Sequence, residues 1–288
     1  NDIFKVQDDL SNEILSELQI NMGVGSRQGK RWASNWKSIE DFTKFLNWRN
    51  ELRTFTKESH LNSQRMLDEL KDLYPEESDL MYVAEAWQIW QRIVMQISTD
   101  KEKDLERLNF VTNKAIELNP ESADAYAARA LIGLTLLNTG CEAALTNVIK
   151  SEESGSTADT LQIGGRVYAK CGDLKKAIRS TRNTLKLAPN DTGWFITGAL
   201  VVLLYETGQI EEIYKLIGKN IEAKDMDQNV LAIYAFLEHK KGNKELAEGY
   251  LSRAKNNGFS RVRLERLILN KELRDKTIKG LLEIGSLE

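Results

Sequence analysis

Residues 158–191 read ADTLQIGGRVYAKCGDLKKAIRSTRNTLKLAPND, and this stretch decides the fold. Apolar and small side chains recur every three to four residues on both sides of Gly172, which is the pattern of two amphipathic helices. Gly172 suits a tight turn between them, because glycine readily adopts the left-handed backbone. Pro189 ends the second helix, since proline disfavours helix in the residue before it. The stretch therefore predicts a helix hairpin.

The same arrangement recurs along the chain. Glycines in the same setting are Gly140, Gly172, Gly208 and Gly242, so successive turns are 32, 36 and 34 residues apart, and Pro120 provides a second proline stop. A hairpin repeated at about 34 residues resembles the tetratricopeptide repeat. The residues that follow the order of that repeat are Leu161, Gly164, Gly165, Tyr168, Gly172, Ala177 and Pro189. The resemblance implies an all-α fold, a tetratricopeptide-like helix-hairpin solenoid with irregular N-terminal hairpins and a C-terminal capping helix.

The two ends of the chain depart from the repeat. A single amphipathic helix is predicted near the N-terminus, with one apolar stripe formed by Ile3, Val6, Leu10, Ile14 and Leu18. Terminal helices are expected at the other end, because a solenoid must cover its last apolar face. We expect an N-terminal junction helix and Gly-rich linker over residues 1–31, degenerate helical hairpins over 32–122, tetratricopeptide repeats over 123–258 and C-terminal capping helices over 259–288.

Short segments spread over the chain resemble one region of bacterial signalling proteins. They are DIFKVQD at 2–8, IELNP at 116–120, LAPND at 187–191 and GFS at 258–260. In order, they are similar to the tetratricopeptide region that follows a TolB-like domain in proteins of the class III adenylate/guanylate cyclase or winged-helix type. The resemblance implies a regulatory or sensory region, with the catalytic and TolB-like domains upstream of Asn1.

Composition argues against several classes of function. Lys and Arg number 40 against 43 Asp and Glu, so no basic excess is available for a nucleic acid. The longest apolar runs, such as 199–205, are far shorter than the about 20 residues of a membrane span. We therefore expect a soluble segment without direct membrane insertion, in the cytoplasm, with the periplasm as the alternative. His60 and His239 have no metal-ligand neighbours in sequence, so we interpret them as ordinary surface or groove histidines and expect no cofactor or metal.

Three further features each have a plain interpretation and an alternative. Cys141 and Cys171 adjoin repeat glycines, and we interpret them as buried or half-buried thiols; the alternative is a disulfide, which needs Cα atoms within about 7 Å. Residues 23–31, GVGSRQGKR, are interpreted as a linker, because their spacing fails that of a phosphate-binding loop. We assign the tryptophans of the first third to packing of the N-terminal hairpins, with an exposed patch that docks an upstream domain as the alternative. These are Trp32, Trp36, Trp48, Trp87 and Trp90.

The first helices of stacked repeats line the concave face that such proteins use for binding. We predict that basic and aromatic side chains of this face form a groove for a protein or peptide with acidic or carboxy-terminal groups; the alternative is a solvated face. The predicted groove residues are Arg166, Lys170, Tyr205, Phe236, His239 and Lys240.

The sequence thus predicts a non-enzymatic protein–protein interaction module. The first hypothesis is the regulatory region of a multidomain bacterial signalling protein such as a nucleotide cyclase. The alternative is a free-standing tetratricopeptide scaffold or a periplasmic assembly factor. An upstream domain of the same chain, or a second copy bound through the N-terminal helix, is a further candidate partner.

Overall fold

The computed structural model describes residues 36–74, 78–188 and 195–285, and every regular element in these ranges is a helix. The all-α prediction is confirmed. The chain divides into two compact units, Asn1–Cys171 and Gly172–Glu288, and each is described by itself. The junction helix, residues 23–31 and Trp32 lie outside the described ranges, and the predicted division into four segments stays a prediction. No helix in the described ranges is long and apolar enough to cross a membrane.

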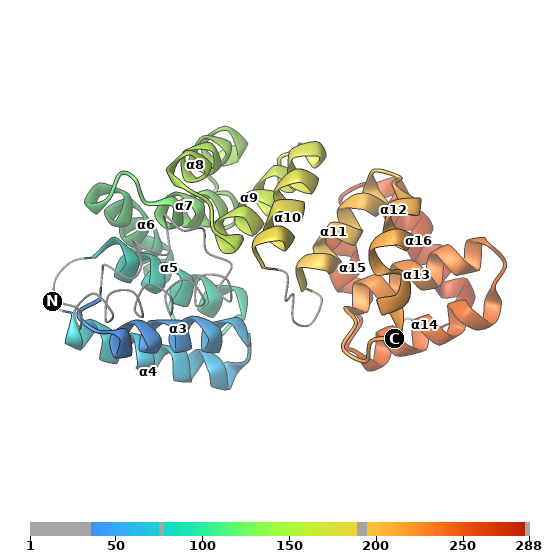
Figure 1. The fold of residues 1–288 in the computed structure, drawn as a ribbon, viewed down its shortest axis with the longest axis horizontal. Coiled ribbons are helices and arrows are strands. Elements are labelled where there is room, and N and C mark those ends of the chain that lie inside the picture. The colour runs from blue at the N-terminus through green and yellow to red at the C-terminus, as the bar shows by residue number, and fades with distance from the viewer. Residues whose placement is uncertain (1–35, 75–77, 189–194, 286–288) are drawn as a thin grey trace, which may run out of the picture. The chain divides into compact units, whose positions relative to one another are not determined.

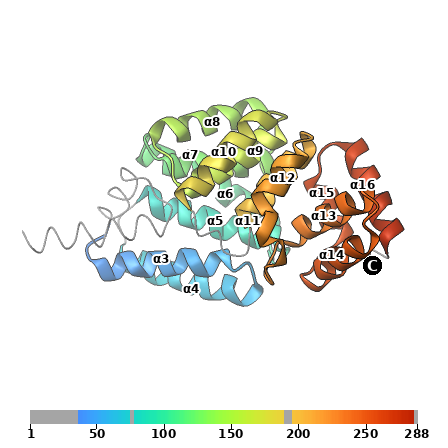
Figure 2. The ribbon, with the colours of Figure 1, turned by 45° about the vertical axis from the view of Figure 1, so that its right-hand side comes forward.

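The first unit is a series of antiparallel helix hairpins (Figure 1). α3 packs against α4, α5 against α6 and α7 against α8, while α5, α7 and α9 lie next to one another as the first helices of successive hairpins. Figure 2 shows α3 and α4 lying side by side. The helices are α3 (Ile39–Arg53), α4 (Lys57–Leu73), α5 (Asp79–Val94), α6 (Lys101–Leu118), α7 (Ala123–Thr135), α8 (Gly140–Ser154) and α9 (Ala158–Lys170).

The second unit continues the helical pattern and ends in a helix that returns to the hairpin before it. α13 packs against α14, α11 contacts α10, α12 and α13, and α16 lies against both α13 and α14. The elements are α10 (Leu174–Leu187), α11 (Phe195–Glu206), α12 (Ile210–Ile217), the 3-10 helix η2 (Gly218–Glu222), α13 (Gln228–Lys240), α14 (Lys244–Asn256), α15 (Arg261–Leu267) and α16 (Lys271–Ile284).

The turn glycines that mark the repeat have the predicted backbone. Their φ angles are +81° at Gly140, +85° at Gly172, +72° at Gly208 and +83° at Gly242. A side chain at such an angle is strained, so glycine is the residue that suits these four positions. The predicted helix end before Pro120 is also confirmed, because α6 ends at Leu118, two residues before this proline.

Aromatic side chains fill the core beneath the first hairpins. Trp48 is buried and stacks on Phe45 with ring centroids 5.4 Å apart, and Trp36 packs against the same cluster. Trp87 and Trp90 meet edge to face at 5.5 Å and pack against the second cluster, between α5, α6 and α7. The packing interpretation is therefore confirmed for these four tryptophans.

A polar group lies buried between α4 and α5. His60 is 3% exposed, and its Nδ1 lies 2.8 Å from Gln91 Oε1. Gln88 Nε2 donates to the His60 carbonyl at 2.8 Å, and Ser63 donates to Gln88 Oε1 at 3.1 Å. The interpretation of His60 as a surface or groove histidine was wrong, because the residue is buried in the core, where its ring pairs with the Gln91 amide and its carbonyl accepts from Gln88.

Asp159, in the first turn of α9, joins this helix to α3. Arg49 Nε donates to Asp159 Oδ2 at 2.8 Å, and Arg53 Nη2 pairs with the other carboxylate oxygen. The side chains of Arg49 and Asp159 are only 10% and 23% exposed. Burial alone would raise the pKa of Asp159, but the charges and hydrogen bonds of Arg49 and Arg53 lower it. The ion pair therefore fixes two helices that are more than 100 residues apart in the sequence.

We expect Asp159→Asn to destabilise the first unit by about 3 kcal/mol at neutral pH, because Arg49 would keep a buried charge without its carboxylate. The carboxylate has a lowered pKa in the folded state, so its contribution is present above its unfolded pKa of about 3.9 and is lost as the pH falls through the folded pKa. Urea unfolding between neutral pH and pH 3 would measure both effects.

Glu117→Gln is the matched control for Asp159→Asn, since Glu117 pairs with Lys114 but is 69% exposed. This variant should change the free energy of unfolding far less. An Asp159→Asn protein as stable as the parent at neutral pH would show that the α3–α9 pair is not a structural tie.

Candidate partner-binding surface

The six predicted groove residues lie on three helices. Arg166 and Lys170 are exposed on α9, in the first unit. The other four lie on α11 and α13, in the second unit. Whether all six share one groove stays a prediction, and the second-unit residues are described alone below.

Tyr205 of α11 and Phe236 of α13 form an aromatic pair. Their ring centroids are 6.2 Å apart with the planes at 80°, an edge-to-face contact. Tyr205 is only 3% exposed and Phe236 only 4%. The Tyr205 hydroxyl lies 2.6 Å from Thr277 Oγ1 of α16, and burial raises the pKa of Tyr205 to about 12. The pair is therefore part of the core of the second unit.

Helix α16 covers this pair through close contacts. A Cβ atom built on Gly280 would lie 2.5 Å from Phe236 Cε2, so only glycine allows the helix to approach the ring this closely. Farther along, Glu283 Oε2 lies 3.1 Å from His239 Nε2. At the start of the helix, Glu206 of α11 accepts the backbone N–H of Asn270 at 3.1 Å. α16 is thus held at its beginning, its middle and its end.

The observed surface differs from the predicted one at the two rings. We expected Tyr205 and Phe236 to project into an open groove, but α16 buries both. Burial of apolar area is favourable by about 25 cal/mol per Å², so the aromatic pair is an advantageous contact for the last helix. His239 is half-buried, and Lys240 stays exposed with Nζ 5.9 Å from the Phe236 ring centroid. A partner could reach the rings only if α16 moved away, and their role in binding stays a prediction.

We expect Gly280→Ala to lower the free energy of unfolding by about 1 to 3 kcal/mol, because the added Cβ would collide with the packed Phe236 ring. Hydrogen exchange should also become faster over residues 271–284. Thermal unfolding and exchange measured by mass spectrometry would test this.

Gly249→Ala is the control for Gly280→Ala. Gly249 is also inside a helix, but a Cβ atom there would meet no other atom within 4 Å. This substitution should stabilise the protein slightly, by up to about 1 kcal/mol, through helix propensity. The same small gain from Gly280→Ala would rule out the close α16 contact.

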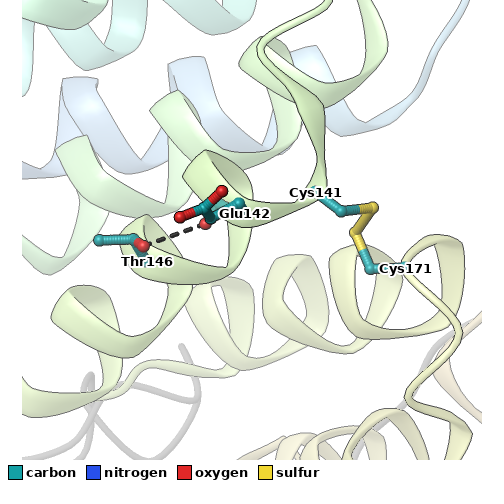
Figure 3. The surroundings of a disulfide bond; sticks show 4 residues. All are labelled: Cys141, Glu142, Thr146 and Cys171. Carbon is teal, nitrogen blue, oxygen red and sulfur yellow. Dashed lines mark hydrogen bonds between the residues drawn. A yellow bond between two sulfur atoms is a disulfide. The ribbon is translucent and has the colours of Figure 1, made fainter.

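The structure joins Cys141 and Cys171 in a disulfide, with Cα atoms 5.6 Å apart (Figure 3). Cys141 lies at the start of α8, and Cys171 caps the end of α9. Within α8, Thr146 Oγ1 donates to the Glu142 carbonyl one turn earlier, at 3.0 Å. The interpretation of both residues as thiols was wrong, and the disulfide alternative is correct. The bond forms because α8 and α9 are packed neighbours, so that the start of one lies beside the end of the other.

Buried carboxylates of the first unit are held in ion pairs. Glu85 contacts Lys71 Nζ at 2.8 Å and Arg107 Nε at 2.6 Å. Burial favours a raised pKa for Glu85, but the hydrogen bonds from Arg107 and Lys71 lower it. Within the described ranges, no group of three or more His, Cys, Asp or Glu side chains is placed to hold a metal ion. The shifted pKa of Glu85 thus reflects ion pairs that join α5 to α4 and α6.

Solved structures of other proteins resemble this chain in fold. PilW, described as a widely conserved type IV pilus biogenesis factor, is similar over 84% of this chain and 99% of its own, with a TM-score of 0.51 and 13% identity. A tetratricopeptide repeat protein from Parabacteroides merdae matches over 83% of this chain and 99% of its own, with a TM-score of 0.38 and 13% identity. No protein-family model and no curated protein matches the sequence.

These findings define the class of the fold. The chain is an all-α, tetratricopeptide-like array of helix hairpins with a C-terminal capping helix. The predicted resemblance to the tetratricopeptide repeat is confirmed at this level.

Proposed function

We propose that this chain is a non-enzymatic tetratricopeptide-like scaffold that holds a protein partner in an oxidising compartment, such as the periplasm. The Cys141–Cys171 disulfide carries the proposal. Disulfides persist in secreted and periplasmic proteins and are rare in the cytosol, where thiols are kept reduced. The bond therefore favours the periplasmic alternative over the cytoplasmic placement expected from the sequence.

The fold supports a binding role. Helix-hairpin repeats present extended surfaces to other proteins, and the contacts of α7 with α5 and α9 support such a surface in the first unit. Arg166 and Lys170 are exposed on the last of these helices. The similar fold of PilW, a pilus biogenesis factor, is consistent with a role as an assembly factor.

The proposal assigns no catalysis to the described residues. Asp159 and Glu85 have shifted pKa values, but arginine or lysine side chains already engage both carboxylates. A catalytic acid or base must reach its substrate, and these ion pairs block the two carboxylates from one. The signalling hypothesis, with a cyclase upstream, stays a prediction, and the reading frame upstream of Asn1 would test it.

The disulfide should be present in cells that express the protein naturally. If cells are quenched with acid and treated with a mass-tagged maleimide, we expect no tag on the parent protein before reduction. The Cys141→Ser variant should take one tag, on Cys171. In the purified protein, reduction should lower the free energy of unfolding by about 3 to 4 kcal/mol, because the bond closes a 30-residue separation. Two tags on the untreated parent protein would overturn the proposal that the protein works in an oxidising compartment.

The binding role can be tested separately by photo-crosslinking. A photoreactive residue in place of Arg166 or Lys170 should give a discrete cross-linked protein in cells. The same residue in place of Lys57, exposed at the start of α4, should give none. Failure of both α9 positions to cross-link any protein would overturn the proposed use of this face.

A further inference from the structure

Helix α10 carries a row of basic side chains along one face. Lys175, Arg179, Arg182 and Lys186 follow one another at spacings of four, three and four residues. At 100° per residue these positions fall within a sector of about 60°, and they extend over about 16 Å of helix. We call these four residues the basic stripe. Lys175, Arg179 and Lys186 are exposed, and the side chain of Arg182 is 42% exposed.

The buried face of α10 lies opposite the stripe and keeps the stripe turned toward solvent. Ala177, Ile178, Thr181 and Thr184 are buried, so the helix cannot turn its basic residues inward. The helix contains five basic residues and no acidic one, whereas the whole chain has 40 basic and 43 acidic residues. The stripe is therefore a local concentration of positive charge on a chain with a net charge of −3.

The charges of the stripe are only partly compensated. Glu212 of α12 places Oε1 2.5 Å from Arg182 Nη2. Asp173, at the start of the helix, contacts Lys176 beside the stripe, at 3.3 Å. Across the residues that the structure describes, no ion pair engages Lys175, Arg179 or Lys186, and Lys186 donates only to Asn183 at 3.3 Å. Like charges four residues apart on a helix repel, so this arrangement weakens the isolated helix.

We propose that the basic stripe of α10 is a docking surface for an acidic segment of a protein partner. The proposal rests on the proposed scaffold function and names the chemistry of its partner. Glu212 already shows how a carboxylate seats on Arg182, and the partner's Asp or Glu side chains take the corresponding places along Lys175, Arg179 and Lys186. The partner segment is linear, because the charges form a row.

The arrangement favours a protein over other anionic partners. The apolar side chains of α10 are buried or half-buried, so the helix presents no exposed apolar face to insert into a lipid bilayer. A nucleic acid would extend beyond the stripe toward a chain that carries more acidic than basic residues. A short acidic peptide can cover the stripe without extending to the acidic residues of the rest of the chain, which would repel it.

A peptide titration tests the proposal. The probe is a fluorescein-labelled alanine-glutamine peptide with glutamates at the spacing of the stripe, measured by anisotropy at low ionic strength. The parent protein should bind it, and Lys175→Glu/Arg179→Glu/Lys186→Glu should bind about tenfold or more weakly, with affinity falling as salt increases. Circular dichroism would confirm that the variant is folded.

The control variant is Lys57→Glu/Lys244→Glu/Lys271→Glu, which reverses the same number of exposed basic residues on α4, α14 and α16. It should bind within about twofold of the parent. Equal loss in both variants, or no binding by the parent, would overturn the stripe as the docking surface. Vesicles rich in anionic lipid provide the other arm, and binding to them in preference to the peptide would overturn the choice of a protein partner.

The crosslinking experiment separates this inference from the proposed function. With a photoreactive residue in place of Lys176, which is exposed on α10 beside the stripe, the stripe variant should lose most of the cross-link and the control variant should keep it. A stripe variant that cross-links normally would overturn the stripe and leave the scaffold function in place. A parent protein that cross-links nothing would overturn the scaffold function itself.

Discussion

Close approach of paired helices at small side chains is the constraint on which this structure depends. Packed helices lie 8 to 10 Å apart, and the closest distances need a small side chain at the contact. Ala115, Ala144 and Ala247 have no exposed surface, and each lies on the second helix of a hairpin within one unit. Gly140, at the start of α8, and Gly242, in the turn before α14, both have positive φ, and they let Ala144 and Ala247 face α7 and α13. Turn and contact together determine the hairpin, and the hairpins then stack.

Local patterns of this kind made the hairpins predictable from the sequence. Gly140 and Gly242 adopt the left-handed turn conformation through their own backbone, and Pro120 lies two residues after the end of α6, so each acts locally. The position of α16 could not be predicted in the same way, because it depends on contacts with residues far away in the sequence. Gly280 looks like a weak point in a helix until Phe236, 44 residues earlier, is placed against it. The burial of Tyr205 follows from that same contact, through Thr277.

The disulfide lies between these two cases. The sequence places Cys141 and Cys171 beside turn glycines one repeat apart, which is a visible signal of neighbouring positions. Whether the two Cα atoms come within bonding range depends on how α8 packs against α9, and this packing has no local signature. The buried His60 was missed for a related reason, because its partners Gln88 and Gln91 lie on the next helix. Polar residues at core positions are interpretable only once their partners are placed.

Side chains that the fold does not constrain give the most direct information about binding. On α10 the buried positions already specify the packing, and any polar residue would serve on the exposed face. Acidic residues placed among the basic ones would stabilise the helix through pairs four residues apart. The chain instead keeps only basic residues there, at some cost to the helix, while α6 carries both signs. Folding does not require this choice. Recognition of a negatively charged partner does, because Lys175, Arg179 and Lys186 remain available to an external carboxylate even though Glu212 already pairs with Arg182.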